Sequence, residues 1–361
     1  MIRKNELRYT SVEICAGAGG QAVGLHNAGF KHVALIEIDK DACQTLRDNT
    51  EGNPEWEGCR VIEADLKAFD PASLGLKPGA LDLLAGGVPC PPFSAAGRQL
   101  GRDDERDLFP TMLELVDDLD PKAVMIENVR GLLDPKFAEY RQDIVKQLES
   151  MGYEKCYWDI LEAKDYGVPQ LRPRAILVAM KPDYARHFEH RKPAATKQVS
   201  VGEALEDSMR ARYAAVEAGP RADEAFKKWY GKALKGVAPT VVGGSKKHGG
   251  ADLGPTRAKR AWEDLGVCGL GVANEPHEMK DMERDLFAPA GPKLTVTQAA
   301  LIQGFDENWK FYGRKTAAYR QVGNAFPPPV AMAVGEQIYA AFEAAERESH
   351  SEAEVLKDSS S

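Results

Sequence analysis

Short apolar runs alternate with helical patterns along the first half of the chain. Apolar residues, many of them β-branched, predict strands at 9–15, 33–37, 60–64, 81–85 and 123–126. A short helix that ends near Gly29 is expected after the first run, and residues 108–119 have helical periodicity. Strands that alternate with helices are typical of an α/β fold with a mostly parallel sheet.

A glycine-rich turn, residues 16–20, follows the first predicted strand. The second strand ends at Glu37, 18 residues after Gly19, and the third strand is followed by Asp65. Glycine lets the backbone approach a ligand, and a carboxylate about 20 residues further on can accept hydrogen bonds from ribose hydroxyls. A nucleoside cofactor is expected, although the G-x-G-x-x-G spacing and a Walker lysine are both absent, and a purely structural turn is the alternative.

Cys90 stands between prolines, directly after the predicted strand 81–85 and a Gly-Gly pair. Pro89 and Pro91 bias the residues before them toward extended backbone, which places the thiol at the carboxyl end of a strand. A thiol in that position is a candidate nucleophile. The alternative is a cysteine buried as a small apolar side chain.

Glu127 directly follows the apolar run 123–126 and tops another predicted strand. Desolvation there would raise its pKa and favour a protonated acid that donates a hydrogen bond, whereas a carboxylate at a surface strand end is the alternative. Before the apolar run 175–179, an extended backbone would place Gln170, Arg172 and Arg174 on one side. Two arginines in that arrangement suit a phosphate or a base oxygen.

The composition, 43% hydrophobic and 28% charged over 361 residues, is that of a globular protein of about two domains. The six scattered cysteines indicate neither a zinc site nor a disulfide framework, and no metal is expected. The N-terminus has no apolar signal core, and no segment has the ~18 apolar residues that span a bilayer. We therefore expect a cytoplasmic protein without a membrane partner.

The net charge of −8 hides a basic segment. Residues 186–293 contain 19 Lys and Arg and 15 Asp and Glu. Within this segment, residues 227–260 contain nine basic residues and one acidic residue, Asp252. A solvated surface is the ordinary explanation of such a run, and a nucleic-acid contact is the other.

The ordered set of these motifs resembles that of the DNA (cytosine-5) methyltransferases of bacterial restriction-modification systems. Residues 13–20 are similar to the family's S-adenosylmethionine loop, Pro89-Cys90 to its nucleophile motif, 127–129 to its ENV motif and 170–174 to its QxRxR motif. Residues 293–305 and 321–328 are similar to its last two motifs. The resemblance spans residues 9 to about 342 outside a middle insert, and it implies a Rossmann-like methyltransferase fold with a smaller target-recognition domain.

The resemblance also implies roles for individual residues. Cys90 would attack C6 of a cytosine flipped out of duplex DNA, and Glu127 would stabilise a proton at N3. Arg172 or Arg174, or a helix terminus, would help to ionise or orient the thiol, and Arg174 would contact the flipped base. Glu37 would bind the ribose of S-adenosylmethionine, Asp65 the adenine amine, and Asn324 would close the site, although an ordinary turn explains Asn324 locally. The methionine moiety would lie along the backbone of Cys15, Ala16, Gly17, Gly19 and Gly20.

Three departures from the family pattern are present, one of which is Pro292, where the penultimate motif often has arginine. Pro91 stands where glutamine is common, which stiffens the base of the loop after Cys90. Cys15 stands where phenylalanine is usual, which weakens the expected stacking against the cofactor.

The insert is expected to be the target-recognition domain, at 186–292 between catalytic segments 1–185 and 293–345, with a disordered tail at 346–361. Cations, glycines and short polar groups in 238–250 and 256–260 suit phosphates and base edges. The helical, acidic stretch 201–224 is expected to be structural. The candidate DNA contacts are Ser94, Gln170, Thr240, Ser245, Lys246, Lys247, Arg257 and Arg260.

We expect a monomer that methylates duplex DNA and protects it from a cognate restriction endonuclease without forming a stable complex with it. A transfer-RNA methyltransferase is one alternative, against which the long basic insert argues. A catalytically silent regulator that binds S-adenosylmethionine or DNA is another, against which Cys90, Glu127 and Arg174 argue.

Overall fold

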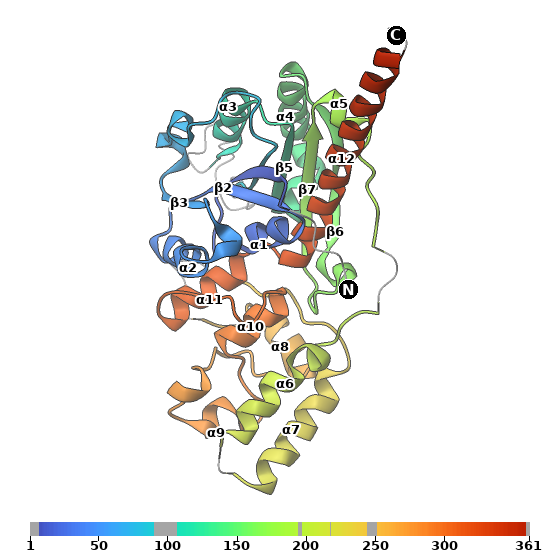
Figure 1. The fold of residues 1–361 in the computed structure, drawn as a ribbon. Helices are drawn as coiled ribbons and strands as arrows, with labels where there is room; N and C mark the ends of the chain where they lie inside the picture. Colours follow the sequence, from blue (N-terminus) through green and yellow to red (C-terminus); the bar gives the residue numbers. More distant parts are fainter. Residues whose placement is uncertain (1–6, 90–106, 194–196, 217, 244–250, 359–361) are drawn as a thin grey trace.

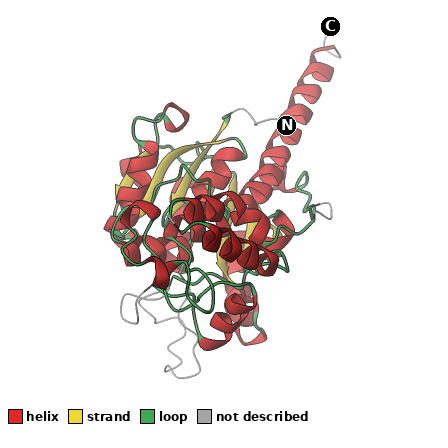
Figure 2. Ribbon diagram, turned by 90° about the horizontal axis from the view of Figure 1, so that it is seen from below, coloured by secondary structure: helices red, strands yellow, loops and turns green. Residues whose placement is uncertain are grey.

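The computed structural model describes residues 7–89, 107–193, 197–216, 218–243 and 251–358, with side chains as far as residue 352. These residues form a sheet of seven strands with helices on both faces (Figure 1; Figure 2). The strands are β1 (Tyr9–Ile14), β2 (Phe30–Glu37), β3 (Arg60–Glu63), β4 (Leu83–Gly87), β5 (Ala123–Val129), β6 (Glu154–Glu162) and β7 (Pro173–Met180).

The strand order is β3-β2-β1-β4-β5-β7-β6. The first five strands in this order run parallel, and β7 runs antiparallel between β5 and β6. The predicted α/β fold with a mostly parallel sheet is therefore confirmed. In an open sheet of this kind, the carboxyl ends of the parallel strands form the edge where ligands bind.

Two helical layers cover the sheet because its strands alternate their side chains between the two faces. On β5, Val124 and Ile126 pack with α3 (Phe109–Leu119) and α4 (Ala138–Ser150), whereas Ala123 and Met125 pack on the opposite face. That opposite face is covered by α1 (Gly20–Asn27), α2 (Lys40–Thr50) and α12 (Pro328–Asp358), with α5 (Pro182–Ala185) alongside.

A second core lies beyond the carboxyl-terminal edge of the sheet (Figure 1). Trp229 and Trp262 are buried in it, and a capping box between Ser200 and Glu203 starts its first helix. The predicted helix at 201–224 forms as two helices that contribute buried side chains to this core. The helices around it are α6 (Val201–Ala214), α7 (Pro220–Ala233), α8 (Thr256–Asp264), α9 (Met282–Asp285), α10 (Val296–Gln303) and α11 (Lys315–Asn324).

The second core also includes side chains between Leu294 and Ala325. Helices α10 and α11 therefore join the insert to the sheet domain rather than belonging to one of them. The domain boundaries at 185 and 292 remain predictions, and packing across the second boundary is extensive.

The predicted disorder of the tail 346–361 is corrected for residues 346–358, because α12 continues as helix to Asp358, and residues 359–361 lie outside the described part of the chain. Acidic side chains of α12 form ion pairs with other segments of the chain: Glu346 pairs with Arg8, and Glu348 lies 2.8 Å from Arg186. The Ala- and Glu-rich sequence favours helix, and the buried Ala345 holds its base. Polar composition alone does not reveal such contacts. Within the described part of the chain, no helix has the length and apolarity to cross a membrane.

Candidate active site

Three residues of the turn after β1 have left-handed backbone conformations. Cys15, Gly17 and Gly19 have φ angles of 51°, 55° and 88°, of which only the glycines adopt this region without steric cost. At the next position, a Cβ on Gly20 would come within 2.1 Å of the carbonyl oxygen of Phe326. The absence of side chains thus lets α1 start close beneath the segment that follows α11.

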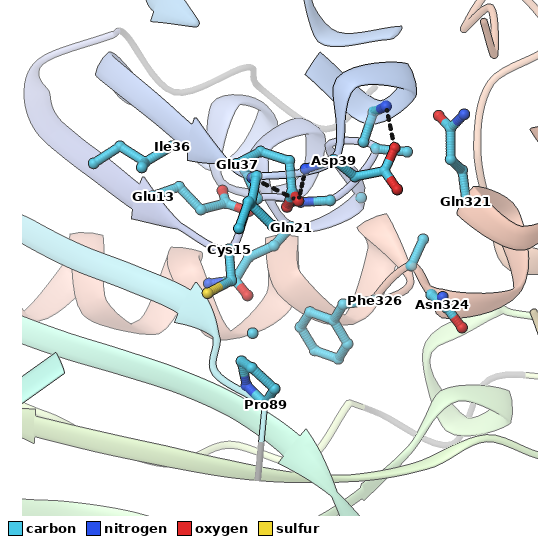
Figure 3. A pocket seen from close by; sticks show the side chains of 18 of the residues that line it. Glu13, Cys15, Gln21, Ile36, Glu37, Asp39, Pro89, Gln321, Asn324 and Phe326 are labelled. Carbon is cyan, nitrogen blue, oxygen red and sulfur yellow. Dashed lines mark hydrogen bonds between the residues drawn. The ribbon is translucent and has the colours of Figure 1, made fainter. Parts of the chain in front are cut away.

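This turn lines a pocket of about 340 Å³ at the carboxyl ends of β1, β2 and β4. Three backbone N–H groups fix the Glu37 carboxylate: Gly17 donates to Oε2 at 2.7 Å, and Ile38 and Asp39 each donate to Oε1 at 2.8 Å. Figure 3 shows Glu37 on one wall, with Phe326 and Asn324 across the pocket. The predicted cofactor residues that line it are Cys15, Ala16, Gly17, Gly20, Glu37, Asp65 and Asn324.

Gly19 lies outside this lining, beneath an aromatic side chain that the sequence analysis did not identify. A Cβ on Gly19 would come within 2.7 Å of the Trp309 ring, and the Trp309 indole N–H donates to the Ala18 carbonyl at 3.0 Å. Trp309 thereby holds the turn from outside the pocket. Nothing in the local sequence indicates that a residue 290 positions away would cover this glycine.

Acidic groups dominate the electrostatics of this pocket. Glu13 is buried, and burial together with the nearby Glu37 raises its pKa well above the usual range. Burial and the carboxylates of Glu37, Glu13 and Asp65 raise the pKa of the Cys15 thiol to about 12, which keeps this thiol neutral at pH 7. In the described segments, no group of three metal-binding side chains gathers around an ion-sized space.

Glu127 ends the buried part of β5 and faces Arg174 on β7. Arg174 Nε lies 2.7 Å from Glu127 Oε1, and both side chains are 14% exposed. Burial raises the pKa of Glu127, although Arg174 and Arg172 act in the opposite direction. The predicted direction of this pKa shift is therefore confirmed, and the guanidinium fixes the direction of the carboxyl group.

A second pocket, of about 640 Å³, adjoins the first. Arg174 and the segment 240–243 of the insert line it, which brings the two domains to one cavity. The two pockets share four lining residues: Gly87, Pro89, Glu127 and Asn324. Glu127 therefore stands where the two ligand spaces meet.

Gln170 was predicted to contact DNA, but the structure buries its side chain. Its side chain has no exposed surface: Nε2 donates to Gln303 Oε1 and to the Ile302 carbonyl, and Oε1 accepts from the Val241 N–H at 2.7 Å. The residue pairs in parallel with Ala238 by a backbone bridge, which carries the insert along this edge. Because its amide is enclosed and satisfied, Gln170 joins chain segments in this structure rather than facing a ligand.

Arg172 is also drawn into the interior, with 1% of its surface exposed. Its guanidinium donates to the carbonyls of Val241 at 2.7 Å and of Gly323 and Ala325 at 2.8 Å. Arg172 also lines the second pocket. These donors join Val241 of the insert and the segment 323–325 to the backbone before β7, which indicates a positioning role, and a direct role of Arg172 in catalysis stays a prediction.

Asn128 is a functional candidate that our sequence analysis named only as part of a motif. Its Nδ2 donates to the Val88 carbonyl at 2.7 Å, and its Oδ1 accepts from the Val129 N–H. The side chain thus anchors the backbone that leads through Pro89 to Cys90. The ENV motif is the sequence signal, but only the fold reveals its target.

The remaining predicted contacts are divided between the surface and the part of the chain that the structure does not describe. Thr240 lines the second pocket and donates its hydroxyl to the Leu171 carbonyl. Arg257 and Arg260 are exposed on α8, where Lys259 pairs with Asp252 at 2.8 Å. Cys90, Ser94, Ser245, Lys246 and Lys247 lie outside the described residues.

Comparison with known proteins gives one consistent family. The model of the C-5 cytosine-specific DNA methylases matches residues 9–340. The type II methyltransferase M.NaeI of Lentzea aerocolonigenes is 51% identical over 91% of this chain and 74% of its own length. The type II methyltransferase M.NgoMIV of Neisseria gonorrhoeae is 48% identical over 92% of this chain and 97% of its own.

Solved structures share the fold at low sequence identity. The DNMT2 of Spodoptera frugiperda superposes with a TM-score of 0.60 at 15% identity, covering 93% of this chain and 100% of that one. The Dnmt2 methyltransferase of S. pombe gives 0.59 at 17% identity, with 93% and 99% covered. These likenesses support the fold assignment alone.

Proposed function

Because the chain belongs to the C-5 cytosine-specific DNA methylase family, we propose that its adjoining pockets hold S-adenosylmethionine and a cytosine flipped out of duplex DNA. The protein is a DNA cytosine-5 methyltransferase. The observation that carries the detailed proposal is the position of Glu127 in the wall common to both pockets. One carboxyl group can there contact the base while the methyl donor lies on the other side.

The first pocket fits an adenosine-type donor. Its size is within the range of small-molecule sites, and Glu37 is held in place by three backbone donors before any ligand arrives. Glu37 would accept from the ribose hydroxyls, Asp65 would accept from the adenine amine, and Asn324 would close the site. When bound, S-adenosylmethionine supplies an electrophilic methyl group on a sulfonium.

The second pocket would take the base. C5 of cytosine is a weak nucleophile, so we assign Cys90 as the thiolate that bonds to C6 while Glu127 donates a proton to N3. The resulting enamine makes C5 nucleophilic. After C5 gains the methyl group, loss of the C5 proton to a base restores the double bond and expels the thiolate, and the N3 proton returns to Glu127.

Arg174 and Asn128 would position these groups. Arg174 Nε can donate to Glu127 Oε1, 2.7 Å away, and so orient the carboxyl group, and Arg174 lines the same cavity, where it can also donate to the base oxygen. Asn128 holds the Val88 carbonyl, two residues before Cys90. The insert would bind the duplex, with Arg257 and Arg260 contacting phosphates and Thr240 facing the base pocket.

The biological role that we propose is the modification half of a type II restriction-modification system. The relatives at 51% and 48% identity are both type II methyltransferases. Methylation of the recognition sequence would protect host DNA from a cognate endonuclease. The enzyme would act as a cytoplasmic monomer, without a stable complex with that endonuclease.

A methyl-transfer assay tests the proposal. Labelled S-adenosylmethionine is offered with duplex DNA or with transfer RNA, and bisulfite sequencing maps the methylated cytosines. We expect label on cytosines of one recurring DNA sequence; transfer only to RNA, or none, would refute the proposal. Cys90→Ser should abolish turnover while DNA binding persists, and turnover retained in this variant would rule out Cys90 as the nucleophile.

A further inference from the structure

The mechanism proposed above does not use two aromatic side chains that contact the glycine turn. Phe305 directly follows the cap of α10, and Trp309 lies four residues further along, before α11. A Cβ on Gly20 would lie 3.2 Å from the Phe305 ring. A Cβ on Gly19 would lie 2.7 Å from the Trp309 ring. The two rings therefore meet consecutive glycines of the turn, although neither ring lines the cofactor pocket.

Trp309 packs against two hydrophobic cores. On one side it packs against the second core, where Phe305 is buried and its ring stacks on that of Trp309 with centroids 6.4 Å apart. On the other side it packs against the cluster of Ala16, Ala22 and Trp56, and its ring centroid lies 6.0 Å from that of Trp56. Ala16 belongs to the turn and Ala22 to α1. One side chain thus carries the packing of the second core to the turn.

The indole N–H of Trp309 adds a polar contact to this packing. It donates to the carbonyl of Ala18, a buried residue, and no other described residue donates to this carbonyl. A buried acceptor without its donor is costly, so this hydrogen bond favours one orientation of the Ala18 peptide. The support is itself held on α2, because Asn49 donates to the Lys310 carbonyl at 2.8 Å and accepts from the Lys310 N–H at 2.9 Å.

The backbone of the turn needs such support. It is left-handed at Cys15, Gly17 and Gly19, a conformation that is unfavourable for the cysteine and only one of several that a glycine adopts readily. Without external contacts, the turn would spend part of the time in other conformations. A ligand that binds one conformation loses affinity in proportion to the fraction of molecules that adopt it.

We propose that Phe305 and Trp309 are positioning residues that hold the glycine turn in the conformation that binds S-adenosylmethionine. This proposal rests on the proposed function, because it takes the first pocket as the site of the methyl donor. Trp309 fixes the Ala18 carbonyl and covers Gly19, and Phe305 supports Gly20 from the same side chain stack. The packing of the second core therefore contributes to cofactor affinity.

Binding and kinetics of the full chain separate positioning from stability. Trp309→Leu removes the ring and the donor, and it should raise the Kd of S-adenosylhomocysteine, the product of methyl transfer, and the KM of S-adenosylmethionine by about 10-fold. At saturating cofactor, kcat should stay within about twofold of the wild type, because the bound ligand restores the turn. Trp309→Phe keeps a ring and loses only the donor, so an intermediate rise of about fivefold is expected.

Trp229→Leu is the matched control. Trp229 is buried in the same core, and its Nε1 has no partner among the described residues. This substitution should lower the melting temperature and leave the cofactor Kd and KM within about twofold of the wild type. Calorimetry measures the Kd, and labelled methyl transfer to duplex DNA gives KM and kcat. Neither Trp309 variant should change the Kd of the duplex measured without cofactor.

A double-mutant cycle tests the contact with the turn itself. Gly19→Ala places a methyl group against the Trp309 ring, whereas Gly17→Ala, also at left-handed backbone, meets no atom within 4 Å. In the Trp309→Leu background, Gly19→Ala should raise the Kd of S-adenosylhomocysteine by a smaller factor than in the wild type. Gly17→Ala should raise it by the same factor in both backgrounds.

Two outcomes would overturn the proposal. The cofactor Kd and KM of both Trp309 variants could lie within about twofold of the wild type. Alternatively, cofactor affinity, kcat and duplex binding could fall together with the melting temperature, which would show that Trp309 only stabilises the fold. If Trp309→Leu does not fold, Trp309→Phe decides between the same outcomes. A wild-type protein that does not bind S-adenosylhomocysteine would instead contradict the proposed cofactor, and that result is separate from these two.

Discussion

Arg174 and Glu127 meet across the antiparallel strands β7 and β5, with Arg174 Nε 2.7 Å from Glu127 Oε1. Arg174 is in register with Val129, two positions beyond Glu127, so the two side chains lie on the same face of neighbouring strands. The pair stands in the wall of the base pocket. A buried carboxyl in this position can keep its proton while the guanidinium fixes its direction.

Glu127→Gln tests the acid directly. Because the amide cannot deliver a proton, kcat should fall by about 10²–10⁴-fold. The Kd of S-adenosylhomocysteine should change little, and Glu154→Gln, at the exposed start of β6, should leave both quantities unchanged. Single-turnover methylation assays measure the effect, and a fall of less than about tenfold would remove Glu127 from proton transfer.

The pH dependence of turnover follows from the raised pKa of Glu127. The protonated acid is present below that pKa and is lost as the pH rises through it, so kcat/KM should decline on the alkaline side. The residual activity of Glu127→Gln should lack this alkaline decline. If kcat/KM of both proteins declines with the same midpoint pH, a group other than Glu127 causes the decline.

Asn128→Asp should misplace the backbone before Cys90. The carboxylate cannot donate to the Val88 carbonyl, and the two oxygens would repel each other. A shift of about 1 Å in a reacting group can cost about 10²-fold in rate, and we expect a loss of that order with cofactor binding intact. Asn308→Asp, on an exposed loop, is the control. Equal kcat in the two variants would contradict the anchoring role.

Arg172→Met should destabilise the protein rather than affect the reaction alone. The buried carbonyls of Val241 and Gly323 would lose the Arg172 donor, and the Ala325 carbonyl would keep only Gln303 Nε2 at 2.9 Å. The free energy of unfolding in urea should fall by about 2–5 kcal/mol, against about 0.5 kcal/mol or less for the exposed Arg260→Met. A stability equal to that of the control, with kcat lost, would restore Arg172 to a direct catalytic role.

Gly243→Ala tests the contact between the insert and α11. A Cβ there would lie 2.4 Å from the Arg320 carbonyl oxygen and 2.5 Å from Asn324 Oδ1. The free energy of unfolding should fall by at least about 2 kcal/mol, and methylation should fall with it because Asn324 borders both pockets. Gly231→Ala in α7 meets no atom within 4 Å and should stabilise by about 0.5–1 kcal/mol. Equal effects of the two substitutions would contradict this close packing.

Arg257→Ala and Arg260→Ala should weaken DNA binding at every sequence. If each guanidinium contacts a phosphate, the slope of log Kd against log salt should decrease by about 1 per substitution. Fluorescence anisotropy with a labelled duplex measures this slope, and Arg347→Ala on α12 serves as the control. A slope equal to that of the control would place α8 away from the duplex.

Local patterns in the sequence were sufficient for the parts of the site that depend on strand ends. The apolar runs predicted strands that form β1 to β5, and Glu37 and Glu127 occupy the positions expected from their places after such runs. The strand β6 was not predicted, because its alternation includes few fully buried residues. The pairing of β6 with β7 stabilises this strand, and the alternation of its own residues does not reveal that pairing.

The sequence by itself determined the family, the order of the motifs and the identity of the reacting groups, because these depend on residue types at fixed local spacing. Only the tertiary structure decided that Gln170 and Arg172 turn inward while Arg174 faces Glu127. An alternating pattern states that side chains point to opposite sides, but the partner on each side comes from segments 47 to 153 residues away. The burial of these polar side chains therefore depends on partners that no local pattern in the sequence indicates.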